Sequence, residues 1–198
     1  YFAGFAFLGD AADTRTLFPY SSTLIDEKDA SDISILEIEL TSRLKKNLPR
    51  NFTLDFGLSD DEGAVALAFA LAWENVTIEK LGNVYSIVVD LSANILAFDF
   101  SEKKIIAAFP VGVSLKSGSD SQPSKGYISS LVRGLYLSDE FGVNIFNEFA
   151  KRLGEIHLNS KYQNYIQLVS VKLSEKAAAK LIDISPLDAK EFSHFVGQ

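Results

Sequence analysis

The chain has 198 residues and a formal net charge of −7, with 47% hydrophobic and 23% charged residues. This composition is typical of a globular protein with a sizeable core, and it excludes wholesale disorder. The acidic balance excludes a duplex nucleic-acid binder and argues against an anionic membrane surface as partner, because both need a basic face. Cysteine is absent, which excludes disulfides, thiol catalysis and thiolate metal sites.

The chain begins with the aromatic run YFAGFAFLG, which has the length of a strand and is followed by Asp10. It is too short to span a membrane and lacks the basic flank of a signal peptide. Because no methionine precedes it, we expect that a signal peptidase has removed an upstream segment. This predicts an extracytoplasmic protein of the bacterial periplasm or cell envelope with no integral membrane segment. The mostly polar residues 10–32 predict a long loop.

A helix is predicted from Ser34 onward. Ser34 and Glu37 have the spacing at which a hydroxyl and a carboxylate satisfy free backbone N–H groups at a helix start. Leucines then recur at spacing four and form one apolar stripe: Leu36, Leu40, Leu44 and Leu48. Pro49 ends the helix.

The strongest pattern in the chain is a long β-hairpin. In residues 64–73, AVALAFALAW, large residues alternate with alanine, which indicates a strand although alanine and leucine favour helices. Gly82-Asn83 predicts a two-residue turn that pairs Leu81 with Val84. With no bulge, this register pairs Ile78 with Ile87, Val76 with Val89, Phe69 with Leu96 and Leu67 with Phe98.

In that register both strands change their buried face near Trp73 and Asn94. The hairpin tip is then predicted to bury one face and the base the other, with the alanine face of the base open to a packing helix. A turn at residues 101–104, SEKK, predicts a third strand with Ala107 opposite Phe98 and Phe109 opposite Leu96.

The remaining residues predict a loop and further helices. Residues 114–126 contain Ser, Gly and Pro and predict a solvated loop. A helix is predicted from about Asp139 to Gly154, with apolar residues on one face: Phe141, Ile145, Phe149 and Leu153. A strand YIQLVSVKL, a short helix SEKAAAKL and a terminal helix from Ser185 are predicted after it.

These elements predict an α+β fold: an antiparallel β-meander with a long hairpin at about 64–110, packed against three or four helices. We predict an α/β module at 1–113 and a helix–strand–helix segment at 127–198, packed on it or forming a second small domain. The order of strand, helix, strand and meander in the first 113 residues resembles the small α/β modules of bacterial envelope proteins, such as the N-terminal domains of TolB-like proteins. The resemblance is one of fold and rests on no diagnostic motif.

No motif for a known chemistry occurs in the sequence. G-x-S-x-G, the P-loop and G-x-G-x-x-G are all missing. His157 and His194 lie near the ends of predicted helices, where an imidazole stabilises the helix C-terminus, and they have no metal-binding spacing. The acidic run SDDEG at 59–63 lacks the spacing of a calcium loop. We therefore predict no catalytic residue, no cofactor and no metal.

One ligand site is predicted at the end of the first strand. Asp10 ends an apolar strand, the position at which open α/β sheets often carry sites, and Arg15 and Tyr20 follow in the next loop. The alternative for Asp10 is that it caps the loop.

Three functions remain open. The leading hypothesis is a noncatalytic extracytoplasmic domain that binds another protein or associates with itself. Its interface is predicted at the hairpin tip, on a cluster that the register places away from Phe69: Val76, Ile78, Ile87 and Val89. Either another part of the chain or a partner must cover this cluster. The alternative is a small-ligand or lipid-binding protein that uses an interior rich in the 15 phenylalanines, and the third is a hydrolase with carboxylate chemistry.

Overall fold

The computed structural model describes residues 1–47, 53–56, 65–99 and 104–156. The chain divides into two compact units, Tyr1–Leu158 and Asn159–Gln198, and every described residue belongs to the first. The strand and helices predicted after residue 156 lie outside the described residues, as do His157 and His194.

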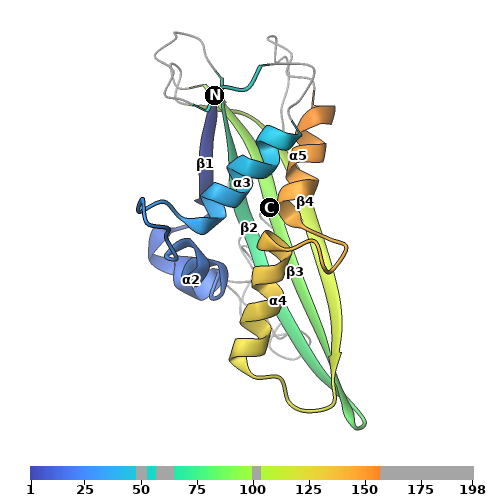
Figure 1. Ribbon diagram of the computed structural model, residues 1–198. Coiled ribbons are helices and arrows are strands. Elements are labelled where there is room, and N and C mark those ends of the chain that lie inside the picture. The colour runs from blue at the N-terminus through green and yellow to red at the C-terminus, as the bar shows by residue number, and fades with distance from the viewer. Residues whose placement is uncertain (48–52, 57–64, 100–103, 157–198) are drawn as a thin grey trace, which may run out of the picture. The chain divides into compact units, whose positions relative to one another are not determined.

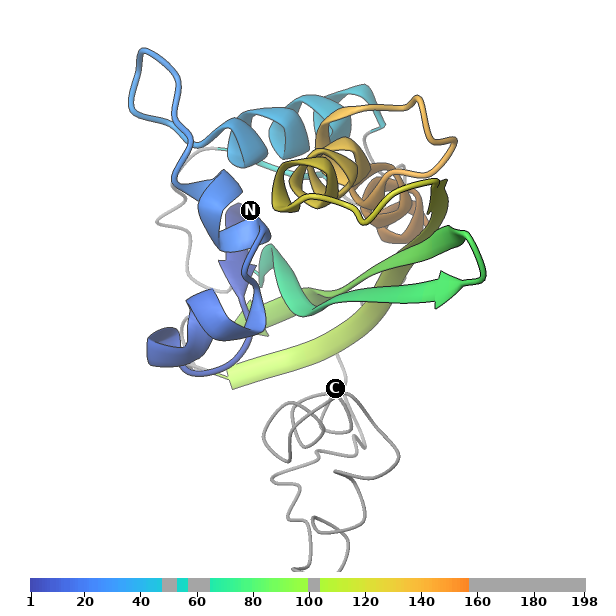
Figure 2. The ribbon, with the colours of Figure 1, turned by 90° about the horizontal axis from the view of Figure 1, so that it is seen from below.

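The first unit is a four-stranded sheet with its longer helices on one face (Figures 1 and 2). The strands follow the order β1 (Phe2–Phe7), β2 (Val65–Leu81), β3 (Val84–Asp99) and β4 (Lys104–Ser119). β1 is parallel to β2, whereas β2, β3 and β4 form an antiparallel meander. The helical elements are η1 (Ala11–Asp13), α1 (Thr14–Leu17), α2 (Ser21–Ile25), α3 (Ile35–Lys46), α4 (Lys125–Leu137) and α5 (Ile145–Glu155). The α+β class, the meander and the long hairpin are as predicted.

The hairpin register agrees with the prediction from the turn as far as Trp73 and then shifts. Leu81 pairs with Val84, as the Gly82-Asn83 turn requires. The predicted pairs Ile78–Ile87 and Val76–Val89 are also present. A bulge between Leu71 and Trp73 then leaves Ala72 as an extra residue on β2. On the part of β2 before the bulge, Phe69 lies opposite Ile95 and Leu67 opposite Ala97, so the predicted partners Leu96 and Phe98 are wrong by one residue.

The third strand is also offset from its prediction. Ala107 lies opposite Ala97 and Phe109 opposite Ile95, again one residue away from the predicted partners. A second irregularity between Ala97 and Phe98 accompanies this offset. Bulges of this kind cannot be read from alternation, because one extra residue leaves the pattern on either side intact.

The bulge explains why the apolar pattern of β2 changes from odd to even positions. It exchanges the two faces of β2 alone, while β3 buries the same face along its length: Ile87, Val89, Leu91, Ala93, Ile95 and Ala97. Phe69 before the bulge and Val76 after it therefore share one face. The predicted switch of the buried face between base and tip is wrong, and the four predicted interface residues lie on the same face as Phe69.

Aromatic rings fill the space between the sheet and the helices. The Phe69 ring on β2 lies 5.0 Å from Phe5 on β1, 5.2 Å from Phe146 and 5.3 Å from Phe149, both on α5. These centroid distances are those of rings in contact. The described helices thus pack on the Phe69 face, and the alanine face of β2, which includes Ala68, is directed away from them.

Helix α3 forms as predicted. Ser34 is its N-cap and accepts a hydrogen bond from the Leu36 N–H at 3.3 Å. Three leucines of the stripe are wholly buried: Leu36, Leu40 and Leu44. Leu48 lies outside the described residues.

Three other segments differ from their predictions. Residues 10–32 contain η1, α1 and α2 rather than a loop alone. The predicted loop 114–126 is short, because β4 continues to Ser119 and α4 begins at Lys125. The helix predicted from Asp139 begins later, because Asn144 caps it by accepting from the N–H groups of Phe146 and Asn147. Within the described ranges, no helix combines the length and apolar character that crossing a membrane requires.

Candidate functional site

The predicted ligand residues Asp10, Arg15 and Tyr20 have separate partners. The Asp10 carboxylate accepts from the Ala12 N–H at 2.9 Å and caps η1, which is the alternative role considered for it. The Arg15 guanidinium lies 3.7 Å from the Asp26 carboxylate at an exposed position. The Tyr20 N–H donates to a buried carboxylate on β2, described below. A ligand-binding role for the three residues stays a prediction.

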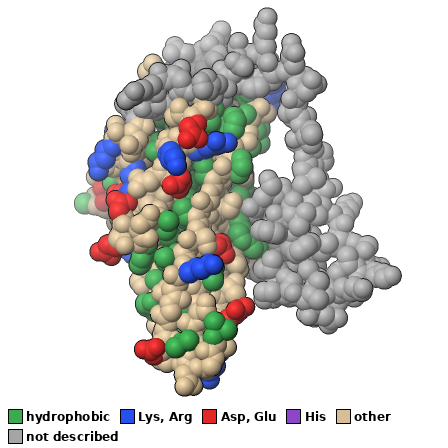
Figure 3. Space-filling model, turned by 90° about the vertical axis from the view of Figure 1, so that its right-hand side faces the viewer, with side chains coloured by type: hydrophobic (Ala, Val, Ile, Leu, Met, Phe, Trp, Pro, Cys, Tyr) green, Lys and Arg blue, Asp and Glu red, His purple; other side chains and the backbone are tan. Residues whose placement is uncertain are grey.

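The predicted interface cluster is divided between the core and the surface. Ile87 and Val89 are wholly buried, and Val76 is half-buried against the same core. Ile78 is 44% exposed. The turn adds exposed Leu81 and Val84, and hydrophobic side chains reach the surface at the lower tip of the unit, where the β2–β3 hairpin ends (Figure 3). A partner role at the tip stays a prediction, and Ile78 is the member of the cluster with the most surface for it.

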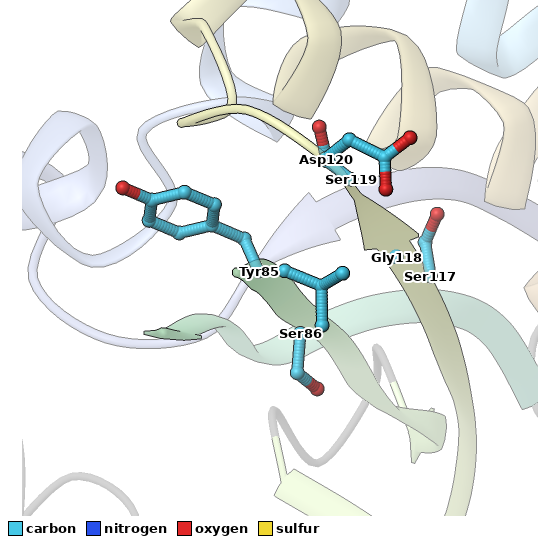
Figure 4. A pocket seen from close by; sticks show the side chains of 7 residues that line it. Tyr85, Ser86, Ser117, Gly118, Ser119 and Asp120 are labelled. Carbon is cyan, nitrogen blue, oxygen red and sulfur yellow. The ribbon is translucent and has the colours of Figure 1, made fainter. Parts of the chain in front are cut away.

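A small hollow of about 370 Å³ lies near this tip, between the start of β3 and the end of β4. Figure 4 shows that the hydroxyl groups of Tyr85 and Ser86 and the carboxylate of Asp120 point in different directions. Catalysis and specific ligand binding need polar groups that converge on one point. This hollow therefore lacks the geometry of a chemical site.

A buried carboxylate, Glu74 on β2, connects three elements. It is 6% exposed, and Oε1 accepts from the Tyr20 N–H at 2.8 Å. Oε2 accepts from the Ser21 N–H at 2.8 Å and from the Ser21 hydroxyl. The hydroxyl of Tyr136 on α4 lies 2.7 Å from Ser21 Oγ. Because the Ser21 hydroxyl donates its single proton to Glu74, the Tyr136 hydroxyl is the donor to Ser21 Oγ. The cluster thus joins the sheet to α2 and α4.

The bulge at Ala72 is what turns Glu74 into the interior. Two residues after the bulge, Glu74 is on the face of β2 that Val76 shares with the core. Sequence reasoning missed this residue. The available signal was a single carboxylate directly after the ten-residue apolar run. Alternation alone does not show on which face of the strand this carboxylate lies.

Burial is the largest influence on the titration of this cluster. It raises the pKa of the Glu74 carboxyl, although the hydrogen bonds from Ser21 and Tyr20 act in the opposite direction. Burial also raises the pKa of the Tyr136 hydroxyl, and the nearby Glu74 charge adds to that effect. Ser21 and Tyr136 have no exposed surface, so the cluster as it stands is a buried structural clamp rather than a centre open to substrate.

The raised pKa of Glu74 predicts a pH-dependent stability. The folded protein binds this proton more tightly than the unfolded chain, so the contribution of Glu74 to stability is greatest below its ordinary pKa. It decreases as the pH rises from about 4 through the pKa of the folded state. We expect the free energy of unfolding of the parent to fall over this range relative to that of Glu74→Gln, which has no proton to lose. Urea unfolding at a series of pH values measures both, and a constant difference would contradict the prediction.

A groove of about 790 Å³ separates the start of β1 from α3. Its apolar wall consists of Phe2 and Phe56 on one side and Ile33 and Ile38 on the other. Ile33, just before α3, is 46% exposed, and Ile38, within α3, is 40% exposed. The described leucines of the stripe on the other face of the same helix are wholly buried. The groove is open to solvent, which suits a polypeptide better than an enclosed small molecule.

The groove differs in charge from the rest of the chain. The charged residues that line it are two lysines, Lys45 and Lys46, and one carboxylate, Glu37, whereas the whole chain has a formal net charge of −7. The Lys45 ammonium lies 5.1 Å from the centre of the Phe56 ring, which places it at the groove wall. The site is thus locally positive and apolar together.

The groove lies beside the free edge of the sheet, because β1 pairs with β2 alone among the described strands. The Leu8 N–H donates inward to the Leu71 carbonyl at 2.7 Å. Backbone groups alternate in direction along a strand, so those of Phe7 and Phe5 point to the free side. At its start the edge is occupied, since the Phe2 N–H donates to the Asp55 carbonyl at 2.7 Å.

The comparisons with known proteins do not assign this chain to a family. No family model matches the chain, and no curated protein matches it. Among solved structures, a minor lipoprotein from Acinetobacter baumannii is similar to 76% of this chain over 85% of its own, with 11% identity and a TM-score of 0.34. At this TM-score the likeness supports no conclusion about fold or function, and the site has to be interpreted from its own geometry.

Proposed function

We propose that this protein is a noncatalytic extracytoplasmic domain that binds another protein at the groove between β1 and α3. The observation that carries the proposal is an apolar, locally positive groove beside an open sheet edge. Exposed isoleucines in a groove are typical of the core of a protein interface, and an unpaired strand edge is a surface to which polypeptides bind.

Two observations favour this function over the alternatives. A lipid or small-ligand binder would use the phenylalanine-rich interior, but the rings around Phe69 are already in contact with one another. A hydrolase would use an accessible carboxylate with a raised pKa, but Glu74 is enclosed by Ser21 and Tyr136. Extracytoplasmic location is part of the proposal and stays a prediction.

The test is a pull-down from the native cell envelope with three forms of the full chain, followed by mass spectrometry of bound proteins and small molecules. We expect Ile38→Arg to lose the bound protein, because a charge in the groove must be desolvated on binding. Leu81→Arg is the matched control, because Leu81 is also an exposed aliphatic residue, at the hairpin tip, with 57% exposure against 40% for Ile38. Loss with Leu81→Arg and retention with Ile38→Arg would move the site to the tip. Recovery of a small molecule and no protein would favour the alternative function.

A further inference from the structure

We infer that the partner is bound as an extended segment that adds to the sheet beside β1, with an acidic residue facing Lys45 and Lys46. This inference rests on the proposed function, because it names the kind of polypeptide that the same groove takes.

The backbone of β1 favours a strand over a helix as the occupant. The outward N–H and C=O groups of Phe5 and Phe7 have no strand beside them among the described residues. An added strand supplies partners for these groups, whereas a helix or a small molecule leaves them to water. β1 has six residues, and Asp55 already occupies its edge at Phe2. At about 3.3 Å per residue, an added strand of about four residues, roughly 13 Å long, covers the remaining edge from Gly4 to Phe7.

The helix side of the groove sets which side chains such a strand carries. Side chains of a strand alternate between its two faces, so every second residue of the segment is directed toward α3. There it meets Ile38 and Ile33, both of which have exposed apolar surface. Apolar, β-branched residues at alternate positions are therefore the complement of this wall.

The charges give the segment a direction along the groove. Lys45 contacts Phe56, and the Phe56 ring lies 6.0 Å from Phe2, so the lysine end of the groove is at the start of β1. Glu37 is farther along, since a Cβ placed on Gly4 would lie 3.4 Å from its carboxylate. An acidic residue fits at the Phe2 end and is repelled at the Gly4 end. In a chain of net charge −7, these lysines are the local attraction that such an acidic segment requires.

The probe is a phage-displayed library of random ten-residue peptides, selected on the full chain and counter-selected on Ile38→Arg. We expect the enriched peptides to have alternating apolar residues followed or preceded by an acidic residue. In NMR spectra of the full chain with an enriched peptide, the exchange rates of the Phe5 and Phe7 amide protons should fall by at least about tenfold. Phe69, whose backbone is already in the sheet, serves as the internal reference.

Charge reversal tests the acidic residue separately. Lys45→Glu with Lys46→Glu should weaken binding of the enriched peptide about tenfold or more, equivalent to about 1.4 kcal/mol. Lys116→Glu with Lys125→Glu is the matched control, because both lysines are exposed and neither lines the groove. If the reversed protein unfolds, Lys45→Gln with Lys46→Gln replaces it, with the same expected direction.

The outcomes separate this inference from the proposed function. Peptides that depend on Ile38 but bind as helices, leave Phe5 and Phe7 unprotected or ignore the lysines would overturn the inference and leave protein binding at the groove in place. Failure to enrich any peptide that depends on Ile38, together with retention of the envelope partner by Ile38→Arg, would overturn both.

Discussion

Replacing Glu74 by alanine is expected to lower the free energy of unfolding by roughly 3–5 kcal/mol. The carboxylate accepts from the Tyr20 N–H, the Ser21 N–H and the Ser21 hydroxyl, and all of these lose their acceptor together. Ser21 has no exposed surface, so its groups cannot turn to water instead. Buried donors without an acceptor retain the full cost of their desolvation.

Glu79→Ala is the matched control, because Glu79 is an exposed carboxylate on the same strand. We expect it to change stability by no more than about 0.5 kcal/mol. Tyr136→Phe removes only the last hydroxyl of the cluster and should fall between the two. Equilibrium urea unfolding measures all three variants. Equal midpoints for Glu74→Ala and Glu79→Ala would show that Glu74 does not hold α2 and α4 to the sheet.

Local signals in the sequence were sufficient for individual elements and for the turn. Gly82 has a φ of 64°, a conformation that glycine adopts readily, and the pairing of Leu81 with Val84 follows from the two-residue loop. Likewise the Ser34 hydroxyl caps α3 and Leu40 of its leucine stripe is buried, so both local patterns that predicted this helix are confirmed. Such signals depend on neighbours within a few residues, so the sequence carries them in full.

The bulge at Ala72 could not be predicted in this way, and the error had consequences for every residue beyond it. Alternation on β2 fits a face switch shared by both strands as well as it fits one extra residue on β2 alone. The burial of Ile95 and Ala97 on β3 decides between them, and burial is set by helices that are distant in sequence. The inward position of Glu74 follows from the same bulge.

The groove at β1 was missed for a related reason. Its walls come from residues 2–4, from Ile33 to Lys46 and from Phe56, and only the folded sheet brings these segments together. Lys45 and Lys46 are adjacent in the sequence, but a helix C-terminus is a common position for lysines, so the pair alone does not indicate a site. What distinguishes them is the Phe56 ring beneath Lys45, a contact between side chains eleven residues apart.

Val89→Lys is expected to lower the free energy of unfolding by roughly 2–4 kcal/mol, because it places a charge without a partner in the core. Val89 is wholly buried, on the face that β2 and β3 turn toward the helices. Had a second molecule covered this cluster, the same substitution would leave the monomer stable and abolish only association. Chemical denaturation and analytical ultracentrifugation of the same samples distinguish the two.

Ile78→Lys provides the matched control for this substitution. Ile78 belongs to the same cross-strand cluster and the same face, but it is 44% exposed, so a lysine there can extend its ammonium group into water. We expect its stability to remain within about 1 kcal/mol of the parent. The pair therefore compares one substitution at two depths of one cluster. If Val89→Lys unfolded at the same denaturant concentration as Ile78→Lys, the tip would not be part of the core, and the bulge at Ala72 would not set the face that it buries.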